Sequence, residues 1–166
     1  MKLFVFSLIF ASLFSGCIKK YPYEDDCSEP IYLSYEKFRA DYPAVKEPRE
    51  IGKAAKIYVY GDTLLINEKN KGVHVVDNRV KETPVNKYFI EIPGNIDMAI
   101  KDDYLYVDSF TDLVVLKIDD IDNIRVVSRK EKVFPYDYEQ YISKEDMDKD
   151  ICYGYDKSRG FIIGYK

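Results

Sequence analysis

The chain has 166 residues, a net charge of −4, and lysines that are scattered rather than clustered. A mildly acidic balance without a basic patch argues against nucleic acid as a partner. Beyond a short leader about 150 residues remain, which is the size of one domain with a proper core. Sixteen tyrosines, many Val and Ile residues and no Trp favour β structure.

The first 16 residues are typical of a secretory leader, and a cysteine follows them. Lys2 supplies a positive start, residues 3–14 form an apolar stretch too short to span a bilayer, and Ser15-Gly16-Cys17 comes next. This ending resembles the lipobox of bacterial lipoprotein signal peptides, although Phe14 stands where that pattern prefers Leu, Val or Ile. The alternative is an ordinary signal peptide with a coincidental cysteine, but this leader lacks the Ala-x-Ala-like end that ordinary cleavage favours.

The lipobox resemblance implies that the Cys17 thiol is acylated and that residues 1–16 are removed as a signal peptide. Two or more acyl chains, such as palmitate, hold a protein stably on a membrane face. Ile18 stands where an inner-membrane retention signal would have Asp, so the resemblance implies the outer membrane of the cell envelope, on its periplasmic or surface face. The acidic run 24–26 loosely resembles surface-export signals, and a solvated tether explains it equally well.

Two further cysteines, Cys27 and Cys152, would belong to the mature chain. An extracytoplasmic compartment permits a disulfide between them. The alternative is two separate free thiols, because no pattern in the sequence brings the two cysteines together.

The middle of the chain repeats itself with a period of about 41 residues. The first copy contains four β-type runs, at 57–60, 63–67, 73–77 and 88–92. The second copy contains four more, at 98–101, 104–108, 113–118 and 124–128. Gly61-Asp62 is typical of a two-residue hairpin turn. The expected fold class is all-β, with two four-stranded propeller-like blade repeats at about 56–94 and 97–135; the alternative is an antiparallel meander with chance similarity.

Two phrases of this repeat resemble a known family. Residues 72–77 (Gly-Val-His-Val-Val-Asp) and 112–118 (Asp-Leu-Val-Val-Leu-Lys-Ile) look like the core of LVIVD-repeat proteins. The resemblance covers roughly residues 50–135, and Lys117 departs from it because the repeat usually has Asp there. The resemblance implies a β-propeller-like fold and an extracytoplasmic lipoprotein, and it brings no established reaction.

The end of the chain predicts a piece of a third repeat. Residues 157–166 read like residues 69–78, with Gly160 in the place of Gly72. Because propellers close with four to eight blades, two repeats and one strand predict an incomplete propeller. Such a chain is a short relative, part of an oligomer or the front of a longer ancestral product.

The flanks of the repeat domain, which spans 51–135, are less regular. Residues 17–50 are expected to form a lipid-anchored tether and lead-in segment. Within it, residues 32–41 predict a short helix or an outer strand, with Ser34 as a helix cap. Residues 136–166 are expected to form a Tyr- and charge-rich insertion followed by the final strand. Tyrosines 134–141 suit a sugar or protein interface, but packing onto the edge of a repeat is favoured.

Catalytic residues are hard to find in this sequence. His74 is the single histidine, so no His pair or Ser-His-Asp arrangement is available, and its strand position predicts an imidazole on the strand surface. Asp146-Met-Asp-Lys-Asp150 opens like a calcium loop, but Ile151 and Lys157 stand where Gly and Glu are required. Residues 119–123 predict a turn. We therefore expect no catalytic residue, no metal and no cofactor.

These observations predict a lipid-anchored, non-catalytic binding or scaffolding module outside the cytoplasm, with a protein or glycan ligand. The alternative is a fragment or subunit of an extracellular glycan-acting hydrolase whose site lies outside this chain. Missing blades should leave an apolar face that residues 31–50, the Tyr-rich insertion or another chain covers. We therefore expect self-association, or aggregation when residues 31–50 are deleted.

Overall fold

The structure is a computed structural model that describes residues 27–142 and 155–166. Strands dominate these residues, which confirms the all-β expectation. The strands are β1 (Pro30–Leu33), β2 (Ala44–Lys46), β3 (Ala54–Tyr60), β4 (Thr63–Glu68), β5 (Gly72–Asp77), β6 (Val85–Glu91), β7 (Met98–Lys101), β8 (Tyr104–Ser109), β9 (Asp112–Lys117), β10 (Arg125–Lys130) and β11 (Phe161–Tyr165). The helix α1 (Tyr35–Asp41) and the 3₁₀ turn η1 (Tyr138–Gln140) accompany them.

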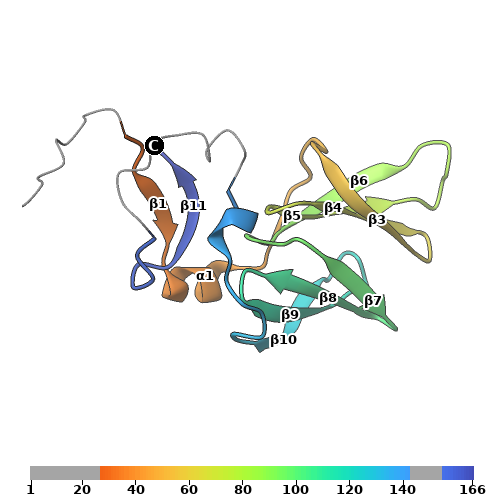
Figure 1. Ribbon diagram of the computed structural model, residues 1–166. Coiled ribbons are helices and arrows are strands. Elements are labelled where there is room, and N and C mark those ends of the chain that lie inside the picture. The colour runs from red at the N-terminus through yellow and green to blue at the C-terminus, as the bar shows by residue number, and fades with distance from the viewer. Residues whose placement is uncertain (1–26, 143–154) are drawn as a thin grey trace, which may run out of the picture.

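The two sequence repeats form two antiparallel meanders (Figure 1). The first sheet has the strand order β2-β6-β5-β4-β3, and the second has the order β10-β9-β8-β7. All eight strands expected for the repeats are present. The first two strands of each repeat are joined by a two-residue hairpin turn, in which Tyr60 faces Thr63 in the first repeat and Lys101 faces Tyr104 in the second. The Gly61-Asp62 turn prediction is confirmed by the positive φ of Gly61.

The main hydrophobic core lies between the two sheets. Alternate side chains of each strand point into it, as the pleat of a strand requires. The first sheet contributes Leu65, Val73, Val75, Ile90 and Ile92. The second sheet and the residue after it contribute Met98, Leu105, Val107, Val114, Leu116 and Ile118.

Equivalent positions of the two repeats lie on opposite faces of their sheets. The hairpin registers make Leu65 equivalent to Tyr106 and Val75 equivalent to Val115. Leu65 and Val75 are buried in the core, whereas Tyr106 and Val115 point away from it and are half-buried. The two sheets therefore pack through non-equivalent faces. One face of the first repeat lies against the opposite face of the second, so the two repeats stack front to back.

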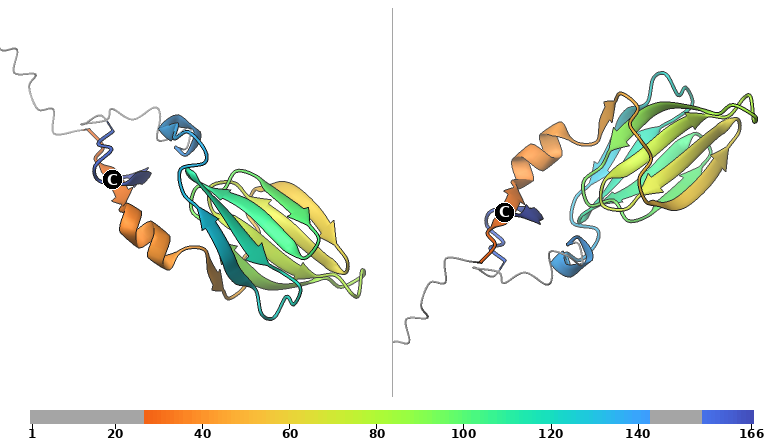
Figure 2. Two further views of the ribbon diagram at one scale, coloured as in Figure 1. Left: turned by 90° about the horizontal axis from the view of Figure 1, so that it is seen from below. Right: turned by 90° about the horizontal axis from the view of Figure 1, so that it is seen from above.

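The N-terminal part of the described chain contributes a strand to each of two sheets. β1 pairs with β11, and β2 adds a fifth strand to the edge of the first sheet beside β6. Residues 47–53 then cross the outer face of the first sheet to reach β3 at its opposite edge, as the right view of Figure 2 shows. The choice between helix and strand for residues 32–41 is resolved, since a strand precedes Ser34 and a helix capped by its side chain follows.

Gly72 and Gly160 occupy corresponding places in β5 and at the start of β11. Both have positive φ values, of 142° and 121°. A Cβ atom would lie 2.0 Å from the Ile90 carbonyl oxygen at Gly72 and 2.1 Å from the Leu33 carbonyl oxygen at Gly160. Only glycine fits so close to a neighbouring strand. The strand predicted after Gly160 is confirmed, and β1 is its pairing partner.

A second, smaller core joins the two-stranded β1/β11 sheet to the second sheet. Phe110, Phe161 and Phe38 pack together, with the rings of Phe110 and Phe161 stacked at 4.2 Å. Tyr136 and Tyr141 of the C-terminal insertion lie against Phe110, so the packing favoured for these tyrosines is confirmed. Phe110 lies in the two-residue turn between β8 and β9, and the aromatic cluster buries its ring.

A buried carboxylate fixes α1 to the second sheet. Asp112 is fully buried and accepts hydrogen bonds from the Arg39 Nε at 3.0 Å and the Arg129 Nη1 at 3.0 Å. The Lys132 backbone N–H and the Thr111 hydroxyl also donate to it. Burial opposes the charge, but these partners outweigh it and hold the pKa of Asp112 below its usual range.

Candidate ligand-binding cleft and the buried Glu68 cluster

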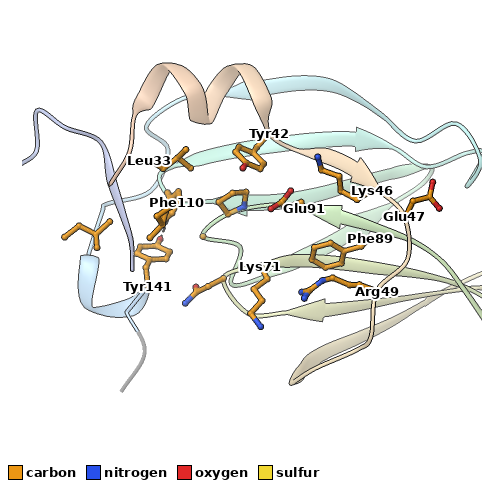
Figure 3. A pocket seen from close by; sticks show the side chains of 15 residues that line it. Leu33, Tyr42, Lys46, Glu47, Arg49, Lys71, Phe89, Glu91, Phe110 and Tyr141 are labelled. Atoms are coloured by element: carbon orange, nitrogen blue, oxygen red, sulfur yellow. Dashed lines mark hydrogen bonds between the residues drawn. The ribbon is translucent and has the colours of Figure 1, made fainter. Parts of the chain in front are cut away.

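A cleft lies between the two-stranded β1/β11 sheet and the first sheet, and it encloses about 470 Å³ (Figure 3). Ile162 and Ile163 of β11 line one side, and Lys46 and Phe89 of strands β2 and β6 line the other. A volume of this order accommodates a small ligand or the side chains of a bound segment. The cleft therefore has room for a small ligand.

Aromatic rings make the apolar lining of this cleft. Tyr42, Phe89, Phe110 and Tyr141 all contribute to it. The Tyr141 hydroxyl donates a hydrogen bond to the Phe110 carbonyl oxygen at 3.2 Å, and burial raises the pKa of Tyr141 to about 12. Because these rings are held by packing and hydrogen bonding, the apolar lining is formed before any ligand arrives.

Two cations on the cleft are held by one buried carboxylate. Glu68, at the end of β4, is 3% exposed at its side chain. The Arg49 Nη2 lies 2.6 Å from its Oε2 and the Lys71 Nζ lies 2.7 Å from its Oε1. The Arg49 guanidinium also lies over the Phe89 ring at 4.0 Å. Both cations keep about half of their side chains in contact with solvent, at 40% and 58%.

The electrostatics of Glu68 follow from its neighbours. Burial raises the pKa of a carboxyl group, but the hydrogen bonds from Lys71 and His74 and the charge of Arg49 lower the pKa of Glu68 by more. The net pKa shift is downward, so Glu68 is an anion at neutral pH. It fixes Arg49 and Lys71 in position on the cleft.

His74 does not lie on the strand surface, so that expectation is wrong. The imidazole is fully buried, and its Nε2 lies 3.1 Å from Glu68 Oε2. Phe89 packs beside it at 4.7 Å between ring centroids. The physical reason is the segment 47–53, which covers the outer face of the first sheet and closes over the position that alternation along β5 would leave in water.

The covering segment is fixed at both of its ends. The Asn86 side chain donates a hydrogen bond to the Arg49 carbonyl oxygen at 2.7 Å. Gly52 lies so close to Glu68 that a Cβ atom there would be 2.8 Å from Oε1. Residues 47–53 therefore cover the outer face of the first sheet, and they lie only partly within the segment 31–50 that was expected to cover an apolar face.

The residues predicted as sites fall partly outside the described chain. Cys17, Cys152 and the calcium-like run 146–150 lie there. Cys27 is described and is disulfide-bonded; its pairing with Cys152 stays a prediction.

Within residues 27–142 and 155–166, no group of three or more His, Cys, Asp or Glu side chains is arranged to hold a metal ion. The turn predicted at 119–123 is confirmed, because Asp120 accepts from the Asp122 backbone N–H.

Sequence reasoning missed Glu68 and Asp112 because each looks like an ordinary strand-end acid. Their partners, Arg49 and Arg39, are distant in sequence and belong to the irregular lead-in segment. A detectable signal was available only for Asp112, which stands where the first repeat has Gly72 and so departs from the repeat pattern.

Comparison of the chain with protein-family models, with curated proteins and with solved structures finds no match. Among the helices of the described residues, none has the length and apolar character needed to cross a membrane.

Proposed function

We propose that this chain is a lipid-anchored, extracytoplasmic binding module that takes its ligand in the cleft between the two-stranded β1/β11 sheet and the first sheet. The cleft carries the proposal. It combines rings fixed by packing with the cations Arg49 and Lys71, which Glu68 already orients. Preorganised apolar and charged groups lose little entropy on binding, which favours affinity.

A propeller-like arrangement of the repeats supports this assignment. Front-to-back stacking, with opposite faces of equivalent repeats in contact, is the relation that successive blades have around a propeller axis. The close approach of Gly160 to β1, which matches that of Gly72 to β6, supports β11 and β1 as the third and fourth strands of a further blade. The cleft then lies between the first repeat and this partial blade.

Within the described chain, the position of His74 supports a structural role for its imidazole rather than an acid-base role. Its Nε2 is bonded to Glu68, and the ring is fully buried behind Phe89 and the segment 47–53. A general acid or base must reach within hydrogen-bond distance of its substrate. His74 therefore acts in this proposal as a structural partner of Glu68.

The lipid anchor has a direct test. Cys17→Ala should leave the protein soluble or unprocessed, whereas the wild type should enter the detergent phase and incorporate radioactive palmitate. Ser15→Ala serves as the matched control, because it keeps a small residue before the cysteine. Equal palmitate labelling of the wild type and Cys17→Ala would disprove acylation at this site.

The cleft has its own test, which does not depend on the anchor. The purified protein is screened against arrays of glycans and envelope peptides, and each hit is measured again with Ile163→Trp. Ile163 is 51% exposed and lines the cleft, so the larger ring should occupy the ligand volume and abolish binding. Val59→Trp is the control, since Val59 is 70% exposed and lies outside the cleft. Hits that survive Ile163→Trp unchanged would place ligand binding elsewhere.

A further inference from the structure

The outer face of the second sheet is open, whereas the equivalent face of the first sheet packs against the second sheet. The left view of Figure 2 shows strands β7–β10 in front, with no other described segment across them. Alternation and register place Tyr106, Val115 and Leu113 in the middle of this face, and all three are half-buried. These positions correspond to Leu65, Val75 and Val73, which in the first repeat pack against a neighbouring sheet.

The charges on this open face are nearly all positive. Lys101, Lys117, Arg125 and Lys130 occupy outward positions on its strands. Lys117 and Arg125 share Asp119 at one corner, whereas Lys101 and Lys130 have no ion-pair partner among the described residues. These cations are gathered on one face of a chain whose net charge is −4.

The single acid in an outward strand position, Asp108, does not offset these cations. Its Oδ1 accepts hydrogen bonds from the Ile96 and Asp97 backbone N–H groups and from the Asn95 side chain. Burial raises the pKa of the Asp108 carboxyl, and the three donors occupy the oxygen that would otherwise face an incoming ligand. An incoming ligand therefore meets a positive surface.

The tyrosines add a second recognition element. Tyr104 and Tyr106 point outward from the same strand, about 7 Å apart along it. Neither hydroxyl has a hydrogen-bond partner among the described residues, although each can both donate and accept one. An exposed tyrosine presents a flat apolar ring together with a polar tip. A ligand made of rings that carry hydroxyl groups matches both parts.

A second copy of this chain does not fit the open face. Two copies related by a two-fold axis would bring the same face together, and four cations would then meet four cations. Like charges placed opposite one another across an interface oppose association. A peptide that bound by strand addition would lie along an edge strand, β7 or β10, whereas the open face offers tyrosine rings and cations, which suit a sugar polymer better.

We propose that the outer face of the second sheet binds an anionic polysaccharide, separately from the cleft. The choice of polysaccharide over nucleic acid rests on the extracytoplasmic location proposed above. The lysines and Arg125 attract the carboxylate or sulfate groups, and Tyr104 and Tyr106 contact the sugar rings. A flat face suits an extended polymer rather than a small enclosed molecule.

The test uses the full chain with polygalacturonate and dextran sulfate as anionic probes and dextran as the neutral one. Lys101→Glu/Lys130→Glu should weaken binding of an anionic probe roughly tenfold. Lys53→Glu/Lys81→Glu is the matched control, with the same change in net charge at exposed lysines off this face, and should change it no more than about twofold. Tyr106→Val keeps a strand-forming residue and the charge, and it should also weaken binding.

Three results would overturn the proposal. The first is binding of neither anionic probe by the wild type. The second is equal weakening by the two charge-reversal pairs, which would indicate net charge alone. The third is binding of poly-glutamate or an oligo-dT strand as tight as that of the polysaccharides, with no effect of Tyr106→Val. Thermal unfolding of each variant confirms folding, and Ile163→Trp should leave polysaccharide binding intact even if the cleft proposal fails.

Discussion

The outer faces of the two sheets carry different positions of the repeat and lie in different environments. On the first sheet, residues 47–53 cross the face and bury His74 and Glu68. On the second sheet, the face carries half-buried Tyr106 and Val115, with lysines at its border. The difference teaches that a repeat does not decide its own burial, because burial depends on what the rest of the chain lays over it.

The largest expected effect compares equivalent valines on the two repeats. Val75→Asp places a charge in the dry core between the sheets and should destabilise the fold by several kcal/mol, out of a typical total of about 5–15 kcal/mol. Val115→Asp makes the same change on the open face and should cost about 1 kcal/mol. Urea unfolding of both variants measures the difference. Similar losses for the two variants would mean that the second face is covered in solution.

The next effect concerns how the first face is kept covered. Glu68→Gln keeps the shape of the side chain but removes the charge that Arg49, Lys71 and His74 share, so it should lower the free energy of unfolding by about 2 kcal/mol. Glu91→Gln, on the same face of the first sheet and half-buried, should change it by less than about 0.5 kcal/mol. Equal effects of the two variants would contradict a special role for Glu68.

The smallest effect is the pH dependence of the contribution that Glu68 makes to the free energy of unfolding. Because the folded-state pKa of Glu68 is lowered, its stabilisation is fully present above the unfolded-state pKa of about 4.3 and is lost as the pH falls through the folded-state value. The stability difference between wild type and Glu68→Gln should therefore be constant near neutrality and shrink below about pH 4. Denaturant unfolding at pH 7, 5 and 3 measures it. A difference that persists unchanged at pH 3 would show that the Glu68 charge does not stabilise the fold.

Local patterns were sufficient to predict the strands of the repeat domain. The Gly61-Asp62 turn and the β-type runs on either side of it depend on a few neighbouring residues, and both are present in the structure as expected. The capped helix at Ser34 was one of two local options, and the structure selected it. Short-range sterics and hydrogen bonding decide such features, so they are readable from sequence.

The candidate site was not predictable in the same way. The cleft is lined by Lys46, Phe89 and Ile163, which come from segments far apart in the chain. The position of Arg49 on the cleft depends on Glu68, which belongs to a different strand. His74 shows the reason most clearly, because its alternation pattern is that of a surface residue. The interactions that bury it come from Arg49 and the residues after it, whose path across the sheet leaves no periodic signal in the sequence.

By itself the sequence determined the β-type repeats, their turns and the strand after Gly160, because each depends on side-chain alternation and backbone freedom within a few neighbouring residues. Only the tertiary structure decided that the repeats stack with opposite faces in contact, that residues 47–53 close one outer face and that the other stays open. These outcomes depend on long-range packing and on the pairing of buried charges such as Asp112 and Arg39, and such contacts are settled only when distant segments meet.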